Sequence, residues 1–194
     1  MSRLPLFPLN LILLPYEVLP LHIFENRYKV MVKNAIDYDT PFGIILNEKK
    51  GIYSKGCKVK ITKVFKEYEN GEYDILVKGM DRFNVIDTNM DGDTIFGEVE
   101  FILPDAKPDL LLINKIQDAY LKVLIKYGVD NNLDHYMNKK ISYDFLSGIQ
   151  LPIELKKALI DLDVETERLN FINQIFNNIL KSSTKPSNGH THEA

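Results

Sequence analysis

The sequence contains no tryptophan and only one cysteine, Cys57, among its 194 residues. A single cysteine excludes an intrachain disulfide and is typical of proteins in a reducing compartment. No apolar run approaches the roughly 20 residues that a membrane-spanning helix needs. Arg3 precedes an apolar stretch, but four interspersed prolines and the absence of a small-residue cleavage site argue against a signal peptide. We therefore expect a cytoplasmic protein without a membrane segment.

An excess of positive charge is also absent, since the formal net charge is −3. Such a chain has no basic field to attract phosphate backbones, so nucleic acid is not an expected partner. A chain of this length buries about 70% of its unfolded surface, which is enough for a core of its own. We therefore expect an ordinary soluble globular fold.

The motifs of the common enzyme classes are missing as well. There is no G-x-S-x-G, no H-E-x-x-H and no C-x-x-C, and in the glycine-spaced stretch 51–58 Cys57 occupies the position of the phosphate-loop lysine. His22 alternates with leucines and is interpreted as structural, while His190 and His192 lack a third metal ligand. We predict no catalytic, cofactor-binding or metal-binding residue.

The chain opens with four prolines among leucines in residues 4–20. Because proline cannot donate to a β-ladder, these residues are confined to strand edges, ends and bends. We predict two short buried strands near Asn10–Leu14 and Val18–Phe24, with a turn at Pro15-Tyr16. The following apolar residues recur at helical spacing and predict an amphipathic helix: Tyr28, Met31, Val32, Ala35 and Ile36.

Three charged residues near these elements are interpreted as structural. Glu25 is expected in the first turn of the helix, where a negative charge suits the helix dipole. Arg27 is expected to pair with a carboxylate or with carbonyls between helix and sheet. Arg82, which precedes Phe83, is expected to brace loops.

Five further strands are predicted before residue 104: residues 41–46, 57–65, 73–77, 82–87 and 94–103. Residues 47–56 are predicted to form a polar loop, Asn70-Gly71 a hairpin turn, and Gly79 a break between two strands. A phase shift of the alternation at residues 63–65 predicts a bulge or bend. About seven short strands with one inserted helix favour a closed or nearly closed barrel.

The second half of the chain has helical periodicity. We predict a helix from Pro108 to a C-cap at Gly128, one or two short helices in residues 134–149, a helix opened by Pro152, and a last helix capped by Asp163. The fold class is thus α+β, with a β-rich subdomain over residues 1–104, a helical subdomain over 105–181 and a disordered tail over 182–194.

Several stretches together resemble the amino-terminal domain of Lon proteases. They are LPLFPL at 4–9, Leu14-Pro15, LPLHIFENRY at 19–28, FGIIL at 42–46, Gly56-Cys57, Asp74-Ile75 with Val77 and Gly79, Arg82-Phe83, LPIELKKAL at 151–159 and Arg168-Leu169. The resemblance implies a PUA-like β pseudobarrel with one inserted helix, followed by an α-helical bundle. It also marks a set of family-motif residues, which we interpret as structural: Pro8, Pro15, His22, Phe24, Glu25, Arg27, Tyr28, Gly43, Gly56, Gly79, Arg82 and Phe83.

Whole Lon proteases add an ATPase module and a serine–lysine protease domain, and this sequence has the motifs of neither. The resemblance therefore implies a stand-alone, non-enzymatic module that binds polypeptide substrates or a partner protein. Two alternatives remain open. One is an RNA-binding module, because PUA-like architecture elsewhere binds RNA. The other is a small-molecule enzyme whose site is assembled from dispersed residues.

Overall fold

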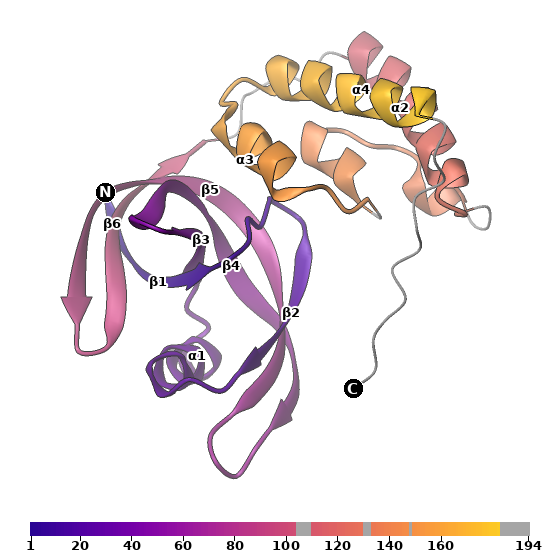
Figure 1. Cartoon of the computed structure of the whole chain (residues 1–194). Helices are drawn as coiled ribbons and strands as arrows, with labels where there is room; N and C mark the ends of the chain where they lie inside the picture. Colours follow the sequence, from indigo (N-terminus) through magenta and orange to yellow (C-terminus); the bar gives the residue numbers. More distant parts are fainter. Residues whose placement is uncertain (104–109, 130–132, 148, 183–194) are drawn as a thin grey trace. The chain divides into compact units, whose positions relative to one another are not determined.

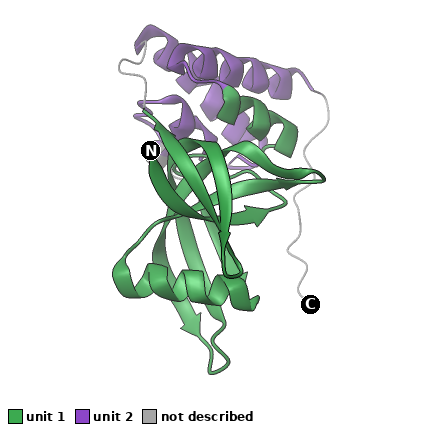
Figure 2. Cartoon of the chain, turned by 90° about the vertical axis from the view of Figure 1, so that its left-hand side faces the viewer, with its two compact units in different colours: residues 1–104, 151–161 green, residues 105–150, 162–194 purple. Residues whose placement is uncertain are grey.

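The computed structural model describes residues 1–103, 110–129, 133–147 and 149–182 (Figure 1). The chain divides into two compact units (Figure 2). The first comprises Met1–Pro104 and Leu151–Asp161, and the second comprises Asp105–Gln150 and Leu162–Ala194. Residues Leu151–Asp161, predicted as part of the helical subdomain, thus belong with the β-rich unit. Of the predicted tail, only Ser182 lies within the described residues.

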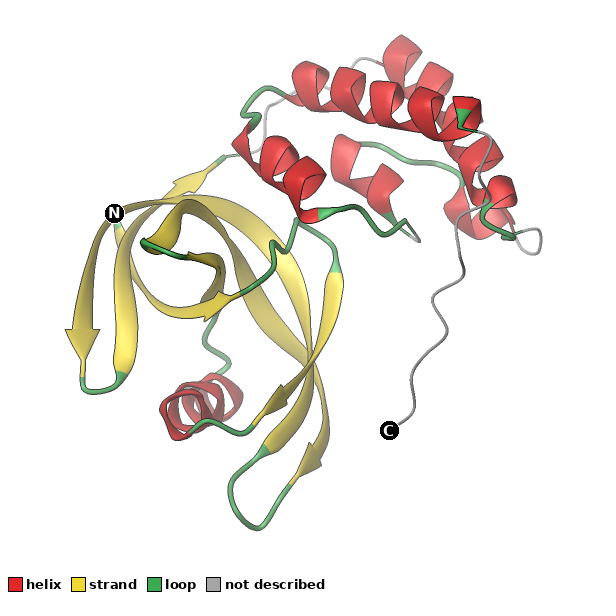
Figure 3. Cartoon of the chain, viewed as in Figure 1, coloured by secondary structure: helices red, strands yellow, loops and turns green. Residues whose placement is uncertain are grey.

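The first unit is built around strands that pair in a cycle (Figure 3). The strands are β1 (Ser2–Leu9), β2 (Val18–Ile23), β3 (Phe42–Glu48), β4 (Gly51–Glu67), β5 (Tyr73–Asp91) and β6 (Thr94–Ile102). β1 pairs in parallel with β3 and antiparallel with β6, while β3–β4, β4–β5 and β5–β6 are antiparallel. These pairings join β1, β3, β4, β5 and β6 into a closed cycle. β2 is added on the first half of β5.

The β5 strand corrects one prediction, because Gly79 lies inside it and does not end it, although the β4–β5 register shifts beside this residue. A Cβ at Gly79 would lie 2.4 Å from the carbonyl oxygen of Leu14. The Gly79 carbonyl accepts a hydrogen bond from the N–H of Tyr16, and its N–H donates to the carbonyl of Glu17. Glycine is therefore needed for the close approach of another backbone, which leaves the strand intact.

The opening segment corrects a second prediction, and the start of β4 corrects a third. The strand is Ser2–Leu9, and residues 10–14 are not in a strand, although Ile12, Leu13 and Leu14 are buried. The predicted polar loop 47–56 is wrong, because β4 already begins at Gly51. The turn at Pro15-Tyr16 is confirmed by the positive φ of 67° at Tyr16, and the irregularity near residues 63–65 by register shifts in the β4–β5 pairing.

Helix α1 (Asn26–Tyr38) is amphipathic as predicted, and its buried face belongs to one core cluster with the strands. A second cluster surrounds Phe83. A Cβ at Gly43 would lie 2.7 Å from the Phe83 ring, and one at Gly56 would lie 2.4 Å from it. Both glycines therefore make room for this fully buried ring.

Helix α3 (Ile153–Asp161) belongs to the first unit, and its residues make polar contacts with other residues of that unit. Arg82 Nη1 donates to the carbonyl of Ile160 at 2.8 Å, and Lys156 Nζ lies 2.7 Å from Glu17 Oε1. Tyr53 Oη donates to Asp161 Oδ2 at 2.5 Å. Arg82 was expected to brace loops, and its hydrogen bond instead goes to the last turn of a helix, α3.

The described part of the second unit is helical. Its elements are α2 (Leu110–Lys126), η1 (Leu133–Tyr136), η2 (Ser142–Leu146) and α4 (Glu165–Lys181). The α2 C-cap prediction is confirmed, since Gly128 has a φ of 86°, whereas Pro108 lies outside the described residues. The predicted Asp163 cap is wrong by one position, because Val164 is the residue that precedes the first turn of α4.

Candidate binding groove

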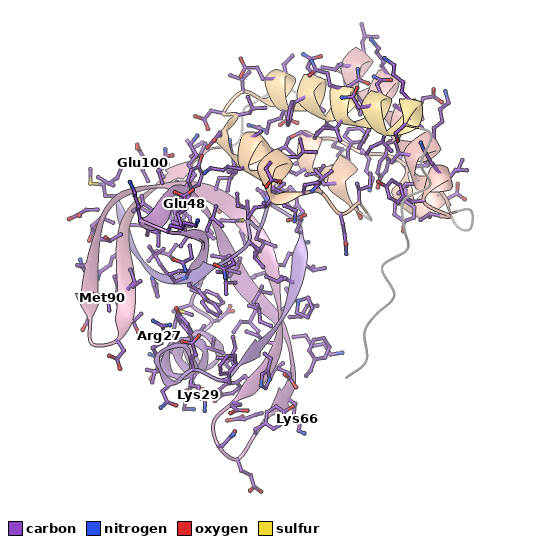
Figure 4. All side chains as sticks on the ribbon, viewed as in Figure 1. Arg27, Lys29, Glu48, Lys66, Met90 and Glu100 are labelled. Carbon is purple, nitrogen blue, oxygen red and sulfur yellow. The ribbon has the colours of Figure 1, made fainter. Side chains whose placement is uncertain are left out.

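An open cleft of about 520 Å³ lies where α1 begins, within the first unit. Residues from the β2–α1 junction and from the β5–β6 hairpin line it: Phe24, Glu25, Asn26, Arg27, Met90 and Asp93. We call this cleft the α1 groove. Figure 4 labels Arg27 on α1 and Met90 on the hairpin.

Two large apolar side chains of the α1 groove are exposed to solvent. Phe24 is 59% exposed and Met90 is 62% exposed. Phe24 follows Ile23, the buried last residue of β2, so the alternation of the strand turns it outward. Met90 stands near the end of β5, where the strand has left the core. Two exposed apolar side chains on the lining of one open cleft give a candidate contact surface for a ligand.

Charged groups form the polar part of the groove. Arg27 donates to Glu25 Oε2 through Nε at 2.9 Å and through Nη2 at 2.6 Å. This hydrogen bond raises the pKa of Arg27, and Asp93 adds to the effect. The groove therefore presents a permanent cation and carboxylates beside the apolar side chains.

This geometry corrects the interpretation of Glu25, whereas Arg27 does pair with a carboxylate, as expected. Glu25 precedes the first turn of α1, and its backbone carbonyl accepts hydrogen bonds from the N–H groups of Tyr28 and Lys29. Its carboxylate makes no cap hydrogen bond and binds Arg27 instead. The partner of Arg27 is thus two residues away, so the pair does not link α1 to the sheet.

A polar cluster around His22 lies next to Phe24. His22 Nδ1 is 2.7 Å from Asp74 Oδ1, and Tyr68 Oη donates to Asp74 Oδ2 at 2.7 Å. Hydrogen bonds from Tyr68 and then His22 lower the pKa of Asp74. The ring of His22 stacks on that of Phe24 at 6.0 Å between centroids. The cluster thus joins β2 to β5 and supports one wall of the groove.

The remaining family-motif residues lie in the body of the first unit. Pro15, Tyr28, Gly43, Gly56, Gly79, Arg82 and Phe83 are buried, and Pro8 is half-buried in β1. The motif therefore divides into residues that shape the fold and three residues, Phe24, Glu25 and Arg27, that reach the groove. Sequence reasoning missed Met90 and Asp93. Their only signal is the Asp91-Gly92 turn, which does not tell what the hairpin lies against.

The described residues contain no group of three His, Cys, Asp or Glu side chains placed to hold a metal ion. Cys57 is fully buried, and burial raises the pKa of its thiol to about 12, as expected of an inert packing residue. No helix in the described ranges has both the length and the apolar character needed to cross a membrane.

Comparison with known families identifies the class of protein. The family model of the ATP-dependent protease La (LON) substrate-binding domain matches residues 3–181. The chain therefore belongs to the family of Lon substrate-binding domains. No curated protein matches the chain.

Solved structures agree with this family at the level of the fold. The Lon N-terminal domain protein from Xanthomonas campestris is 22% identical and superposes with a TM-score of 0.70, covering 91% of this chain and 98% of that one. The N-terminal domain of the Mycobacterium avium complex Lon protease is 18% identical with a TM-score of 0.75, covering 91% and 99%. Both relatives have the mixed α and β architecture described above.

Proposed function

We propose that this chain is a non-catalytic polypeptide-binding module whose α1 groove binds apolar side chains of extended or unfolded segments. The observation that carries the proposal is the exposure of Phe24 and Met90 in one concave site. Membership of a substrate-binding family supports a polypeptide as the ligand.

The groove fits a ligand that offers both apolar and polar groups, because Phe24 and Met90 line it together with charged side chains. Full burial of a Phe or Met side chain contributes about 1.5–3 kcal/mol, so covering the exposed parts of Phe24 and Met90 would contribute at least about 1 kcal/mol each. The Glu25–Arg27 pair keeps both charges satisfied, so an apolar ligand meets no unpaired cation there. Modest energies of this kind favour weak binding with little sequence preference, which suits recognition of many unfolded segments.

Fluorescence anisotropy with a labelled, uncharged peptide of leucine, phenylalanine and serine tests the proposal. The double variant Phe24→Ala/Met90→Ala should weaken binding about 30-fold, which corresponds to the loss of about 2 kcal/mol. Tyr38→Ala is the matched control, because Tyr38 is an exposed aromatic residue of α1 outside the groove.

Equal binding by the wild type and the groove variant would contradict the proposal, as would an equal loss in the Tyr38 control. Thermal unfolding of all three proteins by circular dichroism separates a binding effect from a folding defect. A measurable peptidase or ATPase activity of the purified chain would contradict its non-catalytic character.

Two finer inferences accompany this function. We infer that the cycle of β1, β3, β4, β5 and β6 is a PUA-like pseudobarrel, which is supported by its closed pairing. We also place the protein in the cytoplasm, since its single cysteine suits a reducing compartment. Cell fractionation tests the latter.

A further inference from the structure

The second half of β4 has an open edge. β3 pairs with β4 only as far as Val59, whose partner is Phe42, whereas Lys60–Glu67 pairs with β5 alone. Within the described ranges, no strand lies along the other side of this segment. We call Lys60–Glu67 the β4 edge. The backbone N–H and C=O groups of such an edge are a template for one more strand.

Three lysines, Lys60 and Lys63 on the β4 edge and Lys78 on β5, make no ion pair with a carboxylate among the described residues. Lys60 stands directly opposite Lys78 in the β4–β5 register, and like charges in this position destabilise a sheet. An anionic ligand would relieve this repulsion.

Aromatic rings, in place of carboxylates, hold two of these ammonium groups. Lys63 Nζ lies 4.7 Å from the Phe65 ring centroid, and Lys78 Nζ lies 5.9 Å from that of Tyr16. A ring positions a cation without neutralising it, so the charge remains available to a ligand.

At the end of the β4 edge nearer the β4–β5 turn, the positive charge has a carboxylate opposite it. Figure 4 marks Lys66 there. Its Nζ lies 4.1 Å from the ring centroid of Tyr68, and it stands opposite Asp74, whose carboxylate already binds Tyr68 and His22. The unbalanced positive charge therefore lies at Lys60, Lys63 and Lys78.

We propose that the β4 edge accepts an extended acidic polypeptide segment as an added strand. Backbone pairing supplies affinity, and carboxylates of the segment face the lysines. Val64 and Phe65 are exposed on the same edge, so apolar residues that alternate with the carboxylates find contacts as well. This inference rests on the proposed polypeptide binding but uses a surface that shares no residue with the α1 groove. A single RNA strand would match the lysines but not the open N–H and C=O groups.

The probe is a labelled peptide of alternating glutamate and valine, about eight residues long to match the β4 edge. The variant Lys60→Gln/Lys63→Gln/Lys78→Gln should weaken its binding about tenfold and flatten the salt dependence. Lys49→Gln/Lys50→Gln/Lys115→Gln is the control, because it makes the same charge change at exposed lysines elsewhere. The same peptide with alternate backbone nitrogens methylated should lose binding, since it cannot pair with a strand.

Unchanged affinity in the edge variant, or equal binding of the methylated peptide, would overturn the proposal. Tight, steeply salt-dependent binding of polyuridylate without binding of the peptide would overturn it in favour of RNA. The groove variant Phe24→Ala/Met90→Ala should bind the acidic peptide normally, and the edge variant should bind the uncharged peptide normally. The two binding proposals can therefore fail independently.

Discussion

Two glutamate–arginine pairs of this chain have the same chemistry and opposite surroundings. Glu25 and Arg27 lie 2.6 Å apart in the α1 groove, with side chains 42% and 47% exposed. Glu165 and Arg168 lie 2.7 Å apart in the second unit, with side chains 5% and 3% exposed. The distances are nearly equal, so distance does not tell which pair matters for folding.

The hydrogen bonds around each pair explain the difference. Glu165 also accepts from the backbone N–H and the hydroxyl of Ser142, and Arg168 also donates to the carbonyl of Leu162. This buried network is satisfied on all sides and joins α4 to η2. The exposed pair exchanges its bonds with water at little cost. The buried pair is therefore expected to contribute much more to folding stability than the exposed pair.

The largest expected effect is that of Glu165→Ala. The variant leaves Arg168 buried without its carboxylate, so the free energy of unfolding should fall by about 3–5 kcal/mol. Urea denaturation followed by far-UV circular dichroism measures it. Glu165→Leu/Arg168→Met is the comparison variant and should recover only part of the loss, because it removes the unpaired charge but leaves the Ser142 N–H and hydroxyl and the Leu162 carbonyl without these partners. If Glu165→Ala lowers the free energy of unfolding no more than Glu25→Ala does, the buried pair does not contribute more to stability than the exposed pair.

Arg82→Met extends the comparison to a buried arginine bonded to a backbone carbonyl. The variant leaves the Ile160 carbonyl, at the end of α3, without the hydrogen bond from Nη1. The free energy of unfolding should fall by about 1–3 kcal/mol, less than for Glu165→Ala. The same denaturation experiment measures it, with Arg3→Met as the matched exposed control. A neutral or stabilising effect of Arg82→Met would contradict the bracing role.

Local patterns account for the parts of the fold that could be predicted from the sequence. The α1 face and the Asn70-Gly71 hairpin turn each depend on neighbouring residues, so periodicity and turn chemistry were sufficient. The continuity of β5 could not be predicted, because Gly79 is explained by the carbonyl of Leu14, which a distant segment brings close.

In the candidate site, too, only the residues marked by a local pattern could be predicted. Phe24, Glu25 and Arg27 were singled out by a motif, but Met90 reaches the groove only through the β5–β6 hairpin. The spacing of Glu165 and Arg168 is also that of ordinary surface pairs on a helix. Their burial therefore carried no signal in the sequence.

Lowering the pH tests whether the exposed cluster of His22, Tyr68 and Asp74 contributes to folding stability. The pKa of Asp74 is lowered in the folded state by hydrogen bonds from Tyr68 and His22. A lowered folded pKa stabilises the protein above the unfolded pKa, about 3.9, and this contribution is lost as the pH falls toward the folded pKa. Asp74→Asn should thus make the free energy of unfolding fall less between neutral pH and about pH 3. Asp118→Asn, an exposed position on α2, is the control, and equal pH profiles for Asp74→Asn and the wild type would contradict the linkage.

The smallest expected effect is that of Glu25→Ala, which should change the free energy of unfolding by less than about 0.5 kcal/mol. A double-mutant cycle with Arg27→Ala should give a coupling energy below about 1 kcal/mol that shrinks with added salt. The cycle of Glu165→Ala and Arg168→Ala should give a larger, nearly salt-independent coupling, because buried charges are little screened. Equal coupling energies in the two cycles would show that burial does not change how much each pair contributes to stability. Unequal couplings would mean that burial, and not the distance between the charges, decides how much each pair contributes to stability.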